Sequence, residues 1–383
     1  MKKIIRTSTI AASLDILVKG QLRFLNEHFE VVAVSGEDQH LQNVRNREGV
    51  RVFSIPMQRQ ISPLKDLVSL WKLYVFFRKE KPDIVHSMTP KAGLLSMVAA
   101  RFAGVPIRIH MFTGLIFPSK QGQMQKLLIV MDKLLCRCAT HIFPEGNGVK
   151  NDLVRFKITS KPLNVIANGN VNGVDNQYFD PDLYSESDKN TLKAELKITP
   201  QNFVYIFIGR LVGDKGINEL IAAFKRLATE KPHTKLLLVG GMEADLDPLL
   251  PETVSEIETH PNIISVGFQP DIRPYLAISD ALAFPSYREG FPNVVLQAGA
   301  MGLSSVVSDI NGCNEIIEPG KNGIIIPVKN AEALYVAMND LASDEKLQAR
   351  LRQNSRQVIV QKFSQKEVWN ALLETYQNLE KNV

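Results

Sequence analysis

Residues 280–302 read DALAFPSYREGFPNVVLQAGAMG, and this stretch combines a strand, a turn and the start of a helix. The run DALAFPS is short and apolar, which is typical of a buried strand. Gly290 permits a tight turn, and Pro292 suits the first turn of a helix that begins near Asn293. The stretch therefore predicts a β-turn-α unit with polar side chains just after the strand.

The same alternation of apolar strands and helices recurs along the whole chain. In the first half we predict strands at KKIIRTST (2–9), FEVVAVSG (29–36), VRVFSIPM (50–57), DIVHSMT (83–89), IRIHMFTG (107–114), HIFPEG (141–146) and LNVIANG (163–169). In the second half we predict them at FVYIFIGRL (203–211), TKLLLVGG (234–241), NIISVGF (262–268), DALAFPS (280–286), SSVVSD (304–309) and GIIIPV (323–328). Continuous apolar strands separated by helices indicate parallel sheets that are covered on both faces. The prediction is an α/β protein with two Rossmann-like, doubly wound domains.

A polar stretch, 176–202, is the natural junction between the two sheets. We therefore assign residues 1–175 to an N-terminal domain and 176–360 to a C-terminal domain. The last segment, 361–383, has apolar residues at helical spacing and is predicted to be a closing helix that returns to the first domain.

Composition limits the class of protein. A chain of 383 residues with 45% hydrophobic content is long enough for two cores and too apolar to be disordered. Three cysteines are too few for a disulfide framework, so a reducing, cytoplasmic compartment is expected. We interpret the first 20 residues as a strand and a helix, because Thr7 to Thr9 and Asp15 interrupt what would be the apolar core of a signal peptide.

Charge is unevenly distributed along the chain. Residues 1–175 carry 25 Lys and Arg against 13 Asp and Glu, a balance of +12, and the remainder carries 20 against 27, a balance of −7. The basic residues are scattered and accompany no recognisable nucleic-acid module, so nucleic acid is not an expected partner. Anionic lipid is the alternative partner for a basic half.

One helical segment in the basic half, 119–138, is amphipathic. Its predicted apolar face consists of Leu127, Leu128, Met131, Leu134, Leu135 and Cys138, and Lys126, Lys133 and Arg137 fall on another face. Most such helices simply cover a domain core. The hypothesis is that this one also makes a peripheral contact with an anionic membrane on its cytoplasmic side.

Two polar loops of the second half suit a diphosphate. In IGRLVGDKG (208–216) a strand ends at Gly209-Arg210, and Lys215 precedes the next helix. Two cations therefore converge with backbone that can come close to a diphosphate. Taken alone, the pattern would be explained better by two solvated charges. The turn at Gly290 offers a second anion site, because the first N–H groups of the following helix point outward.

Side chains around that turn suit a sugar and a ribose. Glu289 is placed to accept hydrogen bonds from sugar hydroxyls. Asn293 and Gln297 are four residues apart and share one helix face, so Gln297 could reach ribose hydroxyls one turn beyond the phosphates. A polar residue at a helix boundary is the alternative explanation of Gln297.

These motifs resemble the family 4 retaining glycosyltransferases of the GT-B fold, in which two domains face a cleft. The resemblance covers most of 203–330 through FIGRLVGDKG, AFPSYREGFPNVVLQAGAMG and NGCNEIIEPGKNGIIIPV, in the order and spacing of the family. It is weaker in the first half, through residues 81–114 and 169–181. The bacterial members that build capsules, O-antigens and other lipid-linked glycans are the most similar.

The resemblance implies roles for particular residues. Arg210 and Lys215 match the basic pair that binds the donor diphosphate, and Glu289 matches the first acid of the Glu-x7-Glu motif, which contacts the donor sugar. Gln297 replaces the second acid, so we expect altered nucleotide binding rather than lost catalysis. The positions expected to line the donor site are Gly209, Arg210, Lys215, Gly290, Phe291, Pro292, Asn293, Val294 and Gln297.

The first domain departs from the family pattern. The family's Gly-rich loop after the first strand is replaced by TSTIAASLD (7–15), so Ser13 or nearby backbone would have to serve. The family's first-domain catalytic histidine is matched most nearly by His110, which ends a predicted strand. A core histidine is the alternative for His110.

The resemblance also implies the chemistry. A retaining enzyme of this type needs no metal, no other cofactor and no protein nucleophile, and it takes a nucleotide-sugar donor. We expect UDP and an N-acetylhexosamine, with a glycan or polyprenyl-diphosphate-linked acceptor. The triplet 245–247, Asp-Leu-Asp, mimics a metal-binding motif but is interpreted as a solvated acidic turn.

Other classes stay open at this point. A GT-B-like nucleotide-sugar epimerase would share the diphosphate site but transfer nothing, and the pattern around Glu289 disfavours it. A non-catalytic nucleotide-sugar-binding protein, or pseudoenzyme, is favoured only by Gln297. A nicotinamide dehydrogenase is excluded, because no Gly-x-Gly-x-x-Gly turn follows a strand.

Overall fold

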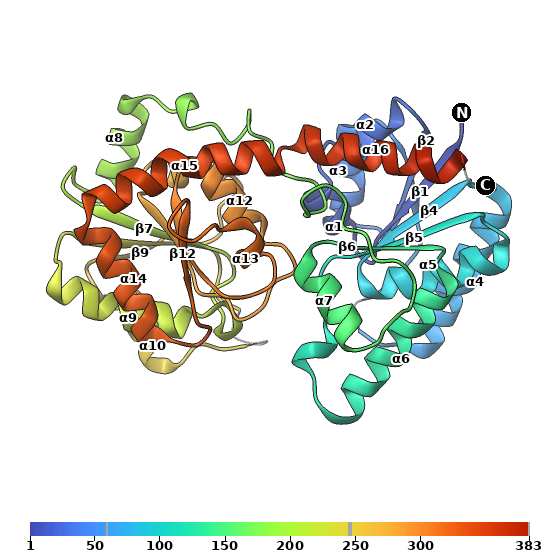
Figure 1. The fold of residues 1–383 in the computed structure, drawn as a ribbon, viewed down its shortest axis with the longest axis horizontal. Coiled ribbons are helices and arrows are strands. Elements are labelled where there is room, and N and C mark those ends of the chain that lie inside the picture. The colour runs from blue at the N-terminus through green and yellow to red at the C-terminus, as the bar shows by residue number, and fades with distance from the viewer. Residues whose placement is uncertain (59, 244–246, 382–383) are drawn as a thin grey trace. The chain divides into compact units, whose positions relative to one another are not determined.

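A computed structural model describes residues 1–58, 60–243 and 247–381. The chain divides into two compact units, one of Met1–Gly173 with Gln365–Val383 and the other of Val174–Ser364. The predicted junctions at 175/176 and 360/361 lie within a few residues of these divisions. Each unit is an α/β body with one parallel sheet (Figure 1).

The first unit contains a six-stranded parallel sheet in the order β3-β2-β1-β4-β5-β6. Its strands are β1 (Lys3–Thr7), β2 (Glu30–Ser35), β3 (Arg51–Ser54), β4 (Ile84–Met88), β5 (Ile107–Phe112) and β6 (His141–Pro144). Its helices are α1 (Ala11–Leu17), α2 (Gln21–Asn26), α3 (Gln39–Glu48), α4 (Pro63–Glu80), α5 (Pro90–Ala103), α6 (Gly122–Cys138), α7 (Asn147–Arg155) and α16 (Gln365–Lys381), with a 3₁₀ turn η1 (Phe117–Ser119).

The two faces of this sheet bury alternate side chains, as strand geometry requires. Ile5 packs into a cluster with apolar residues of α4, α5 and α6. Its neighbour Ile4 packs into a second cluster with residues of α1, α2, α3 and α16. The sheet therefore lies between two helix layers, and α16 from the end of the chain completes one of them, as predicted.

The second unit has its own six-stranded parallel sheet, in the order β12-β11-β10-β7-β8-β9. Its strands are β7 (Phe203–Ile208), β8 (Thr234–Val239), β9 (Ile263–Ser265), β10 (Ala281–Phe284), β11 (Ser304–Ser308) and β12 (Gly323–Ile326). Its helices are α8 (Glu186–Glu195), α9 (Ile217–Glu230), α10 (Pro251–Thr259), α11 (Arg273–Ala277), α12 (Asn293–Ala300), α13 (Cys313–Ile316), α14 (Ala331–Ser343) and α15 (Glu345–Phe363), with 3₁₀ turns η2 (Pro181–Leu183) and η3 (Gly213–Lys215). The two doubly wound sheets confirm the predicted fold class.

One predicted strand, 163–169, is wrong. Leu163 forms a single bridge to Ile142, and the chain then turns, with Gly169 donating its N–H to the Ile166 carbonyl at 3.0 Å. Ala167 and Asn170 have φ values of 50° and 66°, which no strand accommodates. The apolar residues of this segment serve the core without joining the sheet.

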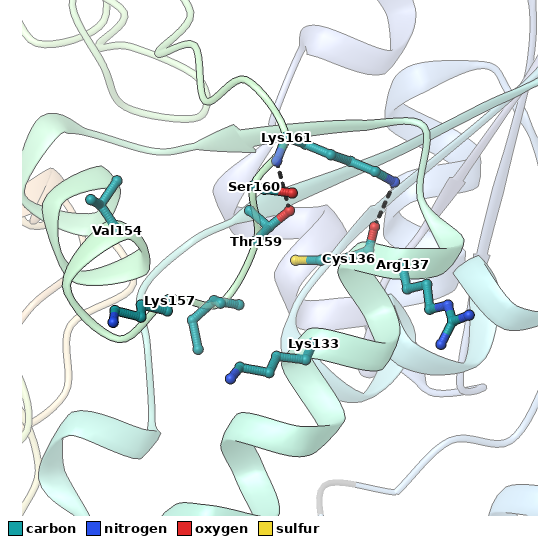
Figure 2. Close-up of a pocket in the computed structure, with 9 residues that line it drawn as sticks. Lys133, Cys136, Arg137, Val154, Lys157, Thr159, Ser160 and Lys161 are labelled. Carbon is teal, nitrogen blue, oxygen red and sulfur yellow. Dashed lines mark hydrogen bonds between the residues drawn. The ribbon is translucent and has the colours of Figure 1, made fainter.

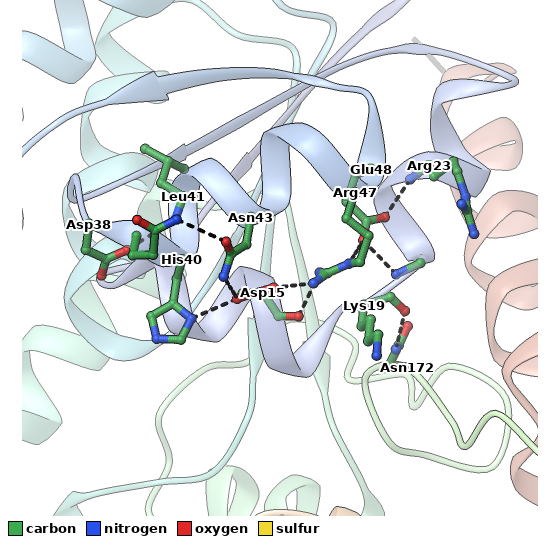
Figure 3. Close-up of polar contacts among 12 residues, drawn as sticks. Asp15, Lys19, Arg23, Asp38, His40, Leu41, Asn43, Arg47, Glu48 and Asn172 are labelled. Atoms are coloured by element: carbon green, nitrogen blue, oxygen red, sulfur yellow. Dashed lines mark hydrogen bonds and ion pairs between the residues drawn. The ribbon is translucent and has the colours of Figure 1, made fainter. Parts of the chain in front are cut away.

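Asp15, which interrupts the apolar run near the N-terminus, is a structural residue of α1. Its carboxylate lies against α3, where His40 Nδ1 is 2.7 Å away, Asn43 Nδ2 donates at 3.2 Å and Arg47 forms an ion pair (Figure 3). Burial by itself would raise the pKa of Asp15, but the hydrogen bonds from His40, Arg47 and Asn43 outweigh it and lower the pKa. The first helix is thus tied to the third.

Candidate active site

The second unit offers a ligand site at the point where its strand order reverses. β7 lies between β10 and β8, so the chain leaves the centre of the sheet in opposite directions. Open parallel sheets bind ligands at the carboxyl ends of the strands beside such a point. The loops there are 209–216, after β7, and 285–292, after β10. The residues predicted for the donor site lie on these loops and on the start of α12.

Lys215 and Glu289 come together at this point. The Lys215 ammonium forms an ion pair with Glu289 Oε1, and Ser286 Oγ donates to the same oxygen at 2.8 Å. Both side chains are largely shielded, with exposed fractions of 18% and 17%. An ammonium has three N–H donors, so Lys215 keeps capacity for a phosphate while it holds Glu289. The pair thus brings together the cation expected for a diphosphate and the carboxylate expected for a sugar.

Glycines let the loops approach this closely. Gly216 has φ +73°, and a Cβ there would lie 2.1 Å from the Pro285 carbonyl oxygen. Gly312, in the loop after β11, has φ +76°, and its Cβ would lie 2.7 Å from the Gly290 carbonyl oxygen. Only glycine fits at these two positions, because backbone occupies the space of a side chain. Backbone from three strand ends therefore converges here.

Arg210 lies in the same region but is held differently. Its guanidinium is exposed and pairs with Glu243 at 2.8 Å. The hydrogen bond that Arg210 donates to Glu243 raises the pKa of Arg210, and the charges of Asp214 and Glu289 raise it further. The structure thus brings Lys215 and Glu289 into contact and leaves Arg210 nearby, bonded to another carboxylate.

The start of α12 carries the remaining predicted residues. Asn293 and Val294 are half-buried in its first turn, where the N–H groups have no carbonyl four residues earlier within the helix. Gln297 is half-buried one turn later. Phe291 is buried and packs against the Phe363 ring at 5.6 Å between centroids. Phe291 therefore anchors the turn in the core, whereas Asn293, Val294 and Gln297 keep partly exposed side chains.

Sequence reasoning missed a second layer of polar contacts. The Tyr287 hydroxyl donates to Glu219 Oε1 at 2.6 Å, and Arg288 pairs with Asp214 at 3.1 Å. Burial, followed by the hydrogen bond to Glu219, raises the pKa of Tyr287. These contacts tie the loop after β10 to the loop after β7. Tyr287 and Arg288 belong to the stretch 280–302, which the sequence marks as unusual. Asp214 and Glu219, in contrast, look in the sequence like surface residues at the start of a helix.

Only one residue of the acidic triplet 245–247 belongs to the described part of the chain. Residues 245 and 246 lie outside the described part of the chain, whereas Asp247 accepts the Asp214 N–H at 2.5 Å. Within 1–58, 60–243 and 247–381, no cluster of three or more potential metal ligands occurs. Asp247 serves to hold the 3₁₀ turn before α9.

His110 lies inside the first unit. Its ring is 1% exposed, its Nδ1 lies 2.8 Å from Ser87 Oγ, and it contacts Phe112 edge-on at 4.5 Å between centroids. A Cβ on Gly93 would lie 2.4 Å from the His110 ring, so α5 needs glycine to make room for it. This position favours the core alternative for His110 over the catalytic one.

The buried imidazole predicts a pH dependence of stability. Burial lowers the pKa of His110 to about 3, whereas an unfolded histidine has a pKa near 6.5. Between these values the unfolded chain binds a proton that the folded chain excludes. The free energy of unfolding should therefore fall as the pH drops from 6.5 towards 3, by up to about 1.4 kcal/mol per pH unit from one such group.

Urea unfolding followed by circular dichroism across this range measures the effect. His110→Asn should flatten the slope, and His233→Gln, at an exposed histidine, should leave it unchanged. Equal slopes for the wild type and His110→Asn would contradict the linkage.

The strand-order reversal of the first unit lies between β1 and β4, where the family's Gly-rich loop is missing. Two threonines hold this turn: Thr9 Oγ1 and Thr89 Oγ1 are 2.8 Å apart, and Thr9 Oγ1 accepts the Ala92 N–H at 3.1 Å. Thr89 has φ +70°, an outlier for a β-branched residue. Ser13 only joins the local turn, donating its N–H to the Ile10 carbonyl at 3.2 Å.

Comparison with known proteins gives the family of this two-unit α/β chain. The chain belongs to the glycosyltransferases: the family model described as glycosyl transferases group 1 matches residues 188–358, and that of a glycosyl transferase 4-like domain matches residues 20–169. The protein is therefore a glycosyltransferase, as the resemblance implied.

Three relatives are similar over most of their length. The capsular polysaccharide biosynthesis glycosyltransferase CapM of Staphylococcus aureus is 30% identical over 98% of this chain and 97% of its own. An Escherichia coli UDP-Gal:alpha-D-GlcNAc-diphosphoundecaprenol alpha-1,3-galactosyltransferase is 29% identical over 88% of this chain and 86% of its own. A Campylobacter jejuni N,N'-diacetylbacillosaminyl-diphospho-undecaprenol alpha-1,3-N-acetylgalactosaminyltransferase is 27% identical over 92% of both chains.

Solved structures share the fold. The Anabaena protein HepE, crystallised with UDP and glucose, superposes with a TM-score of 0.82 at 20% identity, covering 99% of this chain and 100% of its own. The sucrose-phosphate synthase of Thermosynechococcus elongatus superposes with a TM-score of 0.79 at 18% identity, covering 100% of both chains. The GT-B fold implied by the motifs is confirmed.

Proposed function

We propose that this enzyme is a retaining glycosyltransferase that moves a sugar from a UDP-sugar to a glycan or polyprenyl-diphosphate-linked acceptor in surface polysaccharide synthesis. The contact between Lys215 and Glu289 at the strand-order reversal carries the proposal. In this proposal Lys215 is the cation for the leaving group and Glu289 is the carboxylate that binds the sugar, and their contact supports the two roles. The names of the three relatives support the pathway, because each acts in capsular or undecaprenol-linked glycan synthesis.

The chain's own residues would carry the reaction by stabilising the departing diphosphate. As the glycosidic bond breaks, negative charge develops on the phosphate oxygens. Lys215, Arg210 and the first N–H groups of α12 would bind that charge in a partly shielded site, where preorganised donors act most strongly. Glu289 would hold the sugar hydroxyls. The proposal needs neither a metal ion nor a covalent enzyme intermediate.

The donor is proposed from two observations. The Escherichia coli relative is named for UDP-Gal, and HepE binds UDP in its crystal. The Campylobacter jejuni relative transfers N-acetylgalactosamine, which favours an N-acetylhexosamine as the sugar. We therefore propose UDP as the nucleotide and an N-acetylhexosamine as the sugar of the donor.

A panel of nucleotide sugars tests the function. The purified protein is incubated with each donor, and thermal stabilisation is scored in parallel with nucleoside diphosphate release, with and without membrane extract. Stabilisation by a UDP-sugar with extract-dependent release is the expected result. Stabilisation without release under any acceptor condition would favour a non-catalytic binding protein, and release of a free epimerised nucleotide sugar would favour an epimerase.

Gln297 sets the strength of ribose binding in this proposal. Gln297→Glu should tighten UDP binding by about fivefold, because a hydrogen bond to a charged acceptor contributes roughly 1 kcal/mol more than one to a neutral acceptor. Isothermal titration with UDP measures the change. The control is Gln269→Glu, the same substitution at a half-buried glutamine of another loop of the second unit, which should leave UDP binding unchanged. Unchanged affinity in Gln297→Glu would remove Gln297 from the ribose site.

The enzyme is proposed to work on the cytoplasmic side of a membrane, with residues 119–138 in contact with the lipid surface. Part of the predicted apolar face of this segment packs inward, since Leu135 and Cys138 are buried. Leu127 and Leu134 are exposed, together with Met124 and Val130. No helix within 1–58, 60–243 and 247–381 is long and apolar enough to span a bilayer.

A further inference from the structure

The outward face of α4 carries large apolar side chains that are exposed. Its exposed apolar side chains recur at helical spacing and are Leu64, Leu67, Val68, Trp71 and Val75. Leu64 is 82% exposed and Trp71 is 64% exposed. The opposite face supplies buried residues, among them Phe76 and Phe77, to the core. A helix that is apolar on both faces normally lies within a large core or against a membrane, and α4 has a core on one side only.

The charged residues of α4 differ in exposure according to their sign. Lys65, Lys72, Arg78 and Lys79 are exposed beside the apolar side chains. Its two carboxylates are only half-buried but already paired: Asp66 accepts from Lys91 at 2.8 Å, and Glu80 is bonded by Lys3 and Arg51. The exposed face of α4 therefore combines apolar side chains with positive charge.

The helix α6 repeats this pattern. Its exposed apolar residues are Met124, Leu127, Val130 and Leu134, and its exposed cations are Lys126, Lys133 and Arg137. Burial raises the pKa of its one carboxyl group, Asp132, to about 7. Across α4 and α6, every residue of which the structure describes, no Asp or Glu side chain is exposed.

The two faces belong to one surface. α4 packs against α5, and α5 packs against α6, so the three helices form a single layer over one face of the sheet (Figure 1). Phe102, at the end of α5, is 74% exposed within the same layer. We call the outer side of this layer, formed by the exposed residues of α4 and α6 with Phe102, the outer helix face.

A cationic groove adjoins the outer helix face at the end of α6. Lys133 and Arg137 border a groove of about 640 Å³ that Lys157, Ser160 and Lys161 line from the other side (Figure 2). The lining residues include no carboxylate. Lys161 also donates to the Cys136 carbonyl oxygen at 2.7 Å, which holds the groove wall to the helix. Such a groove suits a phosphate group.

We propose that the outer helix face docks on an anionic lipid membrane, with α4 and its Trp71 as the principal anchor and the groove beside α6 receiving a lipid phosphate. Exposed apolar side chains flanked by Lys and Arg are the pattern of an interfacial helix, and the long basic side chains reach the headgroups. A second copy of the chain fits poorly, because an isologous dimer would bring these like charges together.

This docking surface extends the membrane contact proposed for residues 119–138 to α4. It rests on the proposed function only for the lipid-linked acceptor. Docking is measured without donor or acceptor, so a failure of membrane binding is seen separately from a failure of transfer.

Flotation of the full chain with vesicles tests the anchor. The wild type should float with phosphatidylglycerol-containing vesicles and not with pure phosphatidylcholine. A variant with Leu67→Ser and Trp71→Ser should lose roughly tenfold or more of its partitioning, because two large apolar side chains would no longer be buried. Val130→Ser with Leu134→Ser should lose less. Phe268→Ser removes an apolar residue of the second unit that is 78% exposed, and it should change nothing.

Tryptophan fluorescence gives an independent readout. The chain has two tryptophans, Trp71 and Trp369, and Trp369 is tied to Asn172 by its indole N–H at 2.7 Å. Anionic vesicles should shift the wild-type emission to shorter wavelength, and Trp71→Phe should abolish the shift.

Three results would overturn the assignment. The first is full flotation of the α4 variant with loss confined to the α6 variant. The second is binding that ignores lipid charge. The third is a wild-type dimer that the α4 variant converts to a monomer while vesicle binding stays unchanged, since the outer helix face would then be a contact between copies.

Discussion

Replacement of Lys215 by alanine should lower turnover by about two to three orders of magnitude, the scale of removing one preorganised donor from a developing charge. The loss should appear in kcat, because the ammonium would act mainly on the departing diphosphate. Steady-state release of nucleoside diphosphate measures it. Thermal unfolding of the same variant separates this effect from misfolding.

The matched control for this substitution is Lys225→Ala. Lys225 also pairs with a glutamate of its unit, Glu256, but 59% of its side chain is exposed on the surface. Exposed pairs contribute little, so this variant should keep its activity within about twofold. Arg210→Ala should also reduce turnover, because Arg210 lies close enough to Glu289 for the charge of that carboxylate to raise the pKa of Arg210. A Lys215→Ala enzyme with full turnover would remove Lys215 from the diphosphate site.

Replacement of Glu289 by glutamine should cost about a hundredfold in turnover. The change keeps the shape of the side chain and the contact with Ser286 but removes the charge that holds Lys215. Glu256→Gln, at the surface pair, is the matched control. The measurement is kcat and KM for the donor that the nucleotide-sugar panel identifies.

The double variant sharpens this prediction. Because Lys215 and Glu289 are in direct contact, their effects should not add, and the double variant should be only slightly worse than the poorer single one. Losses that multiply would show that the two residues act independently in spite of their contact.

Much of the fold could be predicted because buried parallel strands produce continuous apolar runs in the sequence. Every strand of the second sheet, from β7 to β12, lies within a run predicted in this way. The failure at 163–169 has a specific cause: its residues are apolar enough for a strand, but the turn at Ala167 depends on a left-handed backbone that composition does not reveal.

The candidate site was predictable where a motif constrains the backbone. Gly216 permits the loop after β7 to approach the loop after β10, and Lys215 and Glu289 lie on these two loops. His110 was harder to place, because a strand-end position in the sequence does not tell whether the side chain points to solvent or to the core. The neighbouring glycine on α5, Gly93, makes room for the ring, but only the structure pairs the two.

The outer face of α4 escaped prediction for a related reason. Sequence periodicity detects a helix with one apolar face, whereas α4 has apolar residues on its exposed face as well as on its buried face, so the pattern does not tell which of them are exposed. Only the exposed fractions distinguish Trp71 from Phe77. The amphipathic segment 119–138 was conspicuous because its cations interrupt the apolar residues.

The docking of α16 into the first unit sets the order of events during synthesis. Leu372 and Tyr376 belong to the core formed by β1, β2 and β4, and the Tyr376 hydroxyl contacts the buried Arg6 at 3.0 Å and His86 at 2.5 Å. The ribosome makes the entire second unit before it makes these residues. The unit that begins first is therefore completed only after the second, and the nascent chain must carry an open hydrophobic face until α16 has been made.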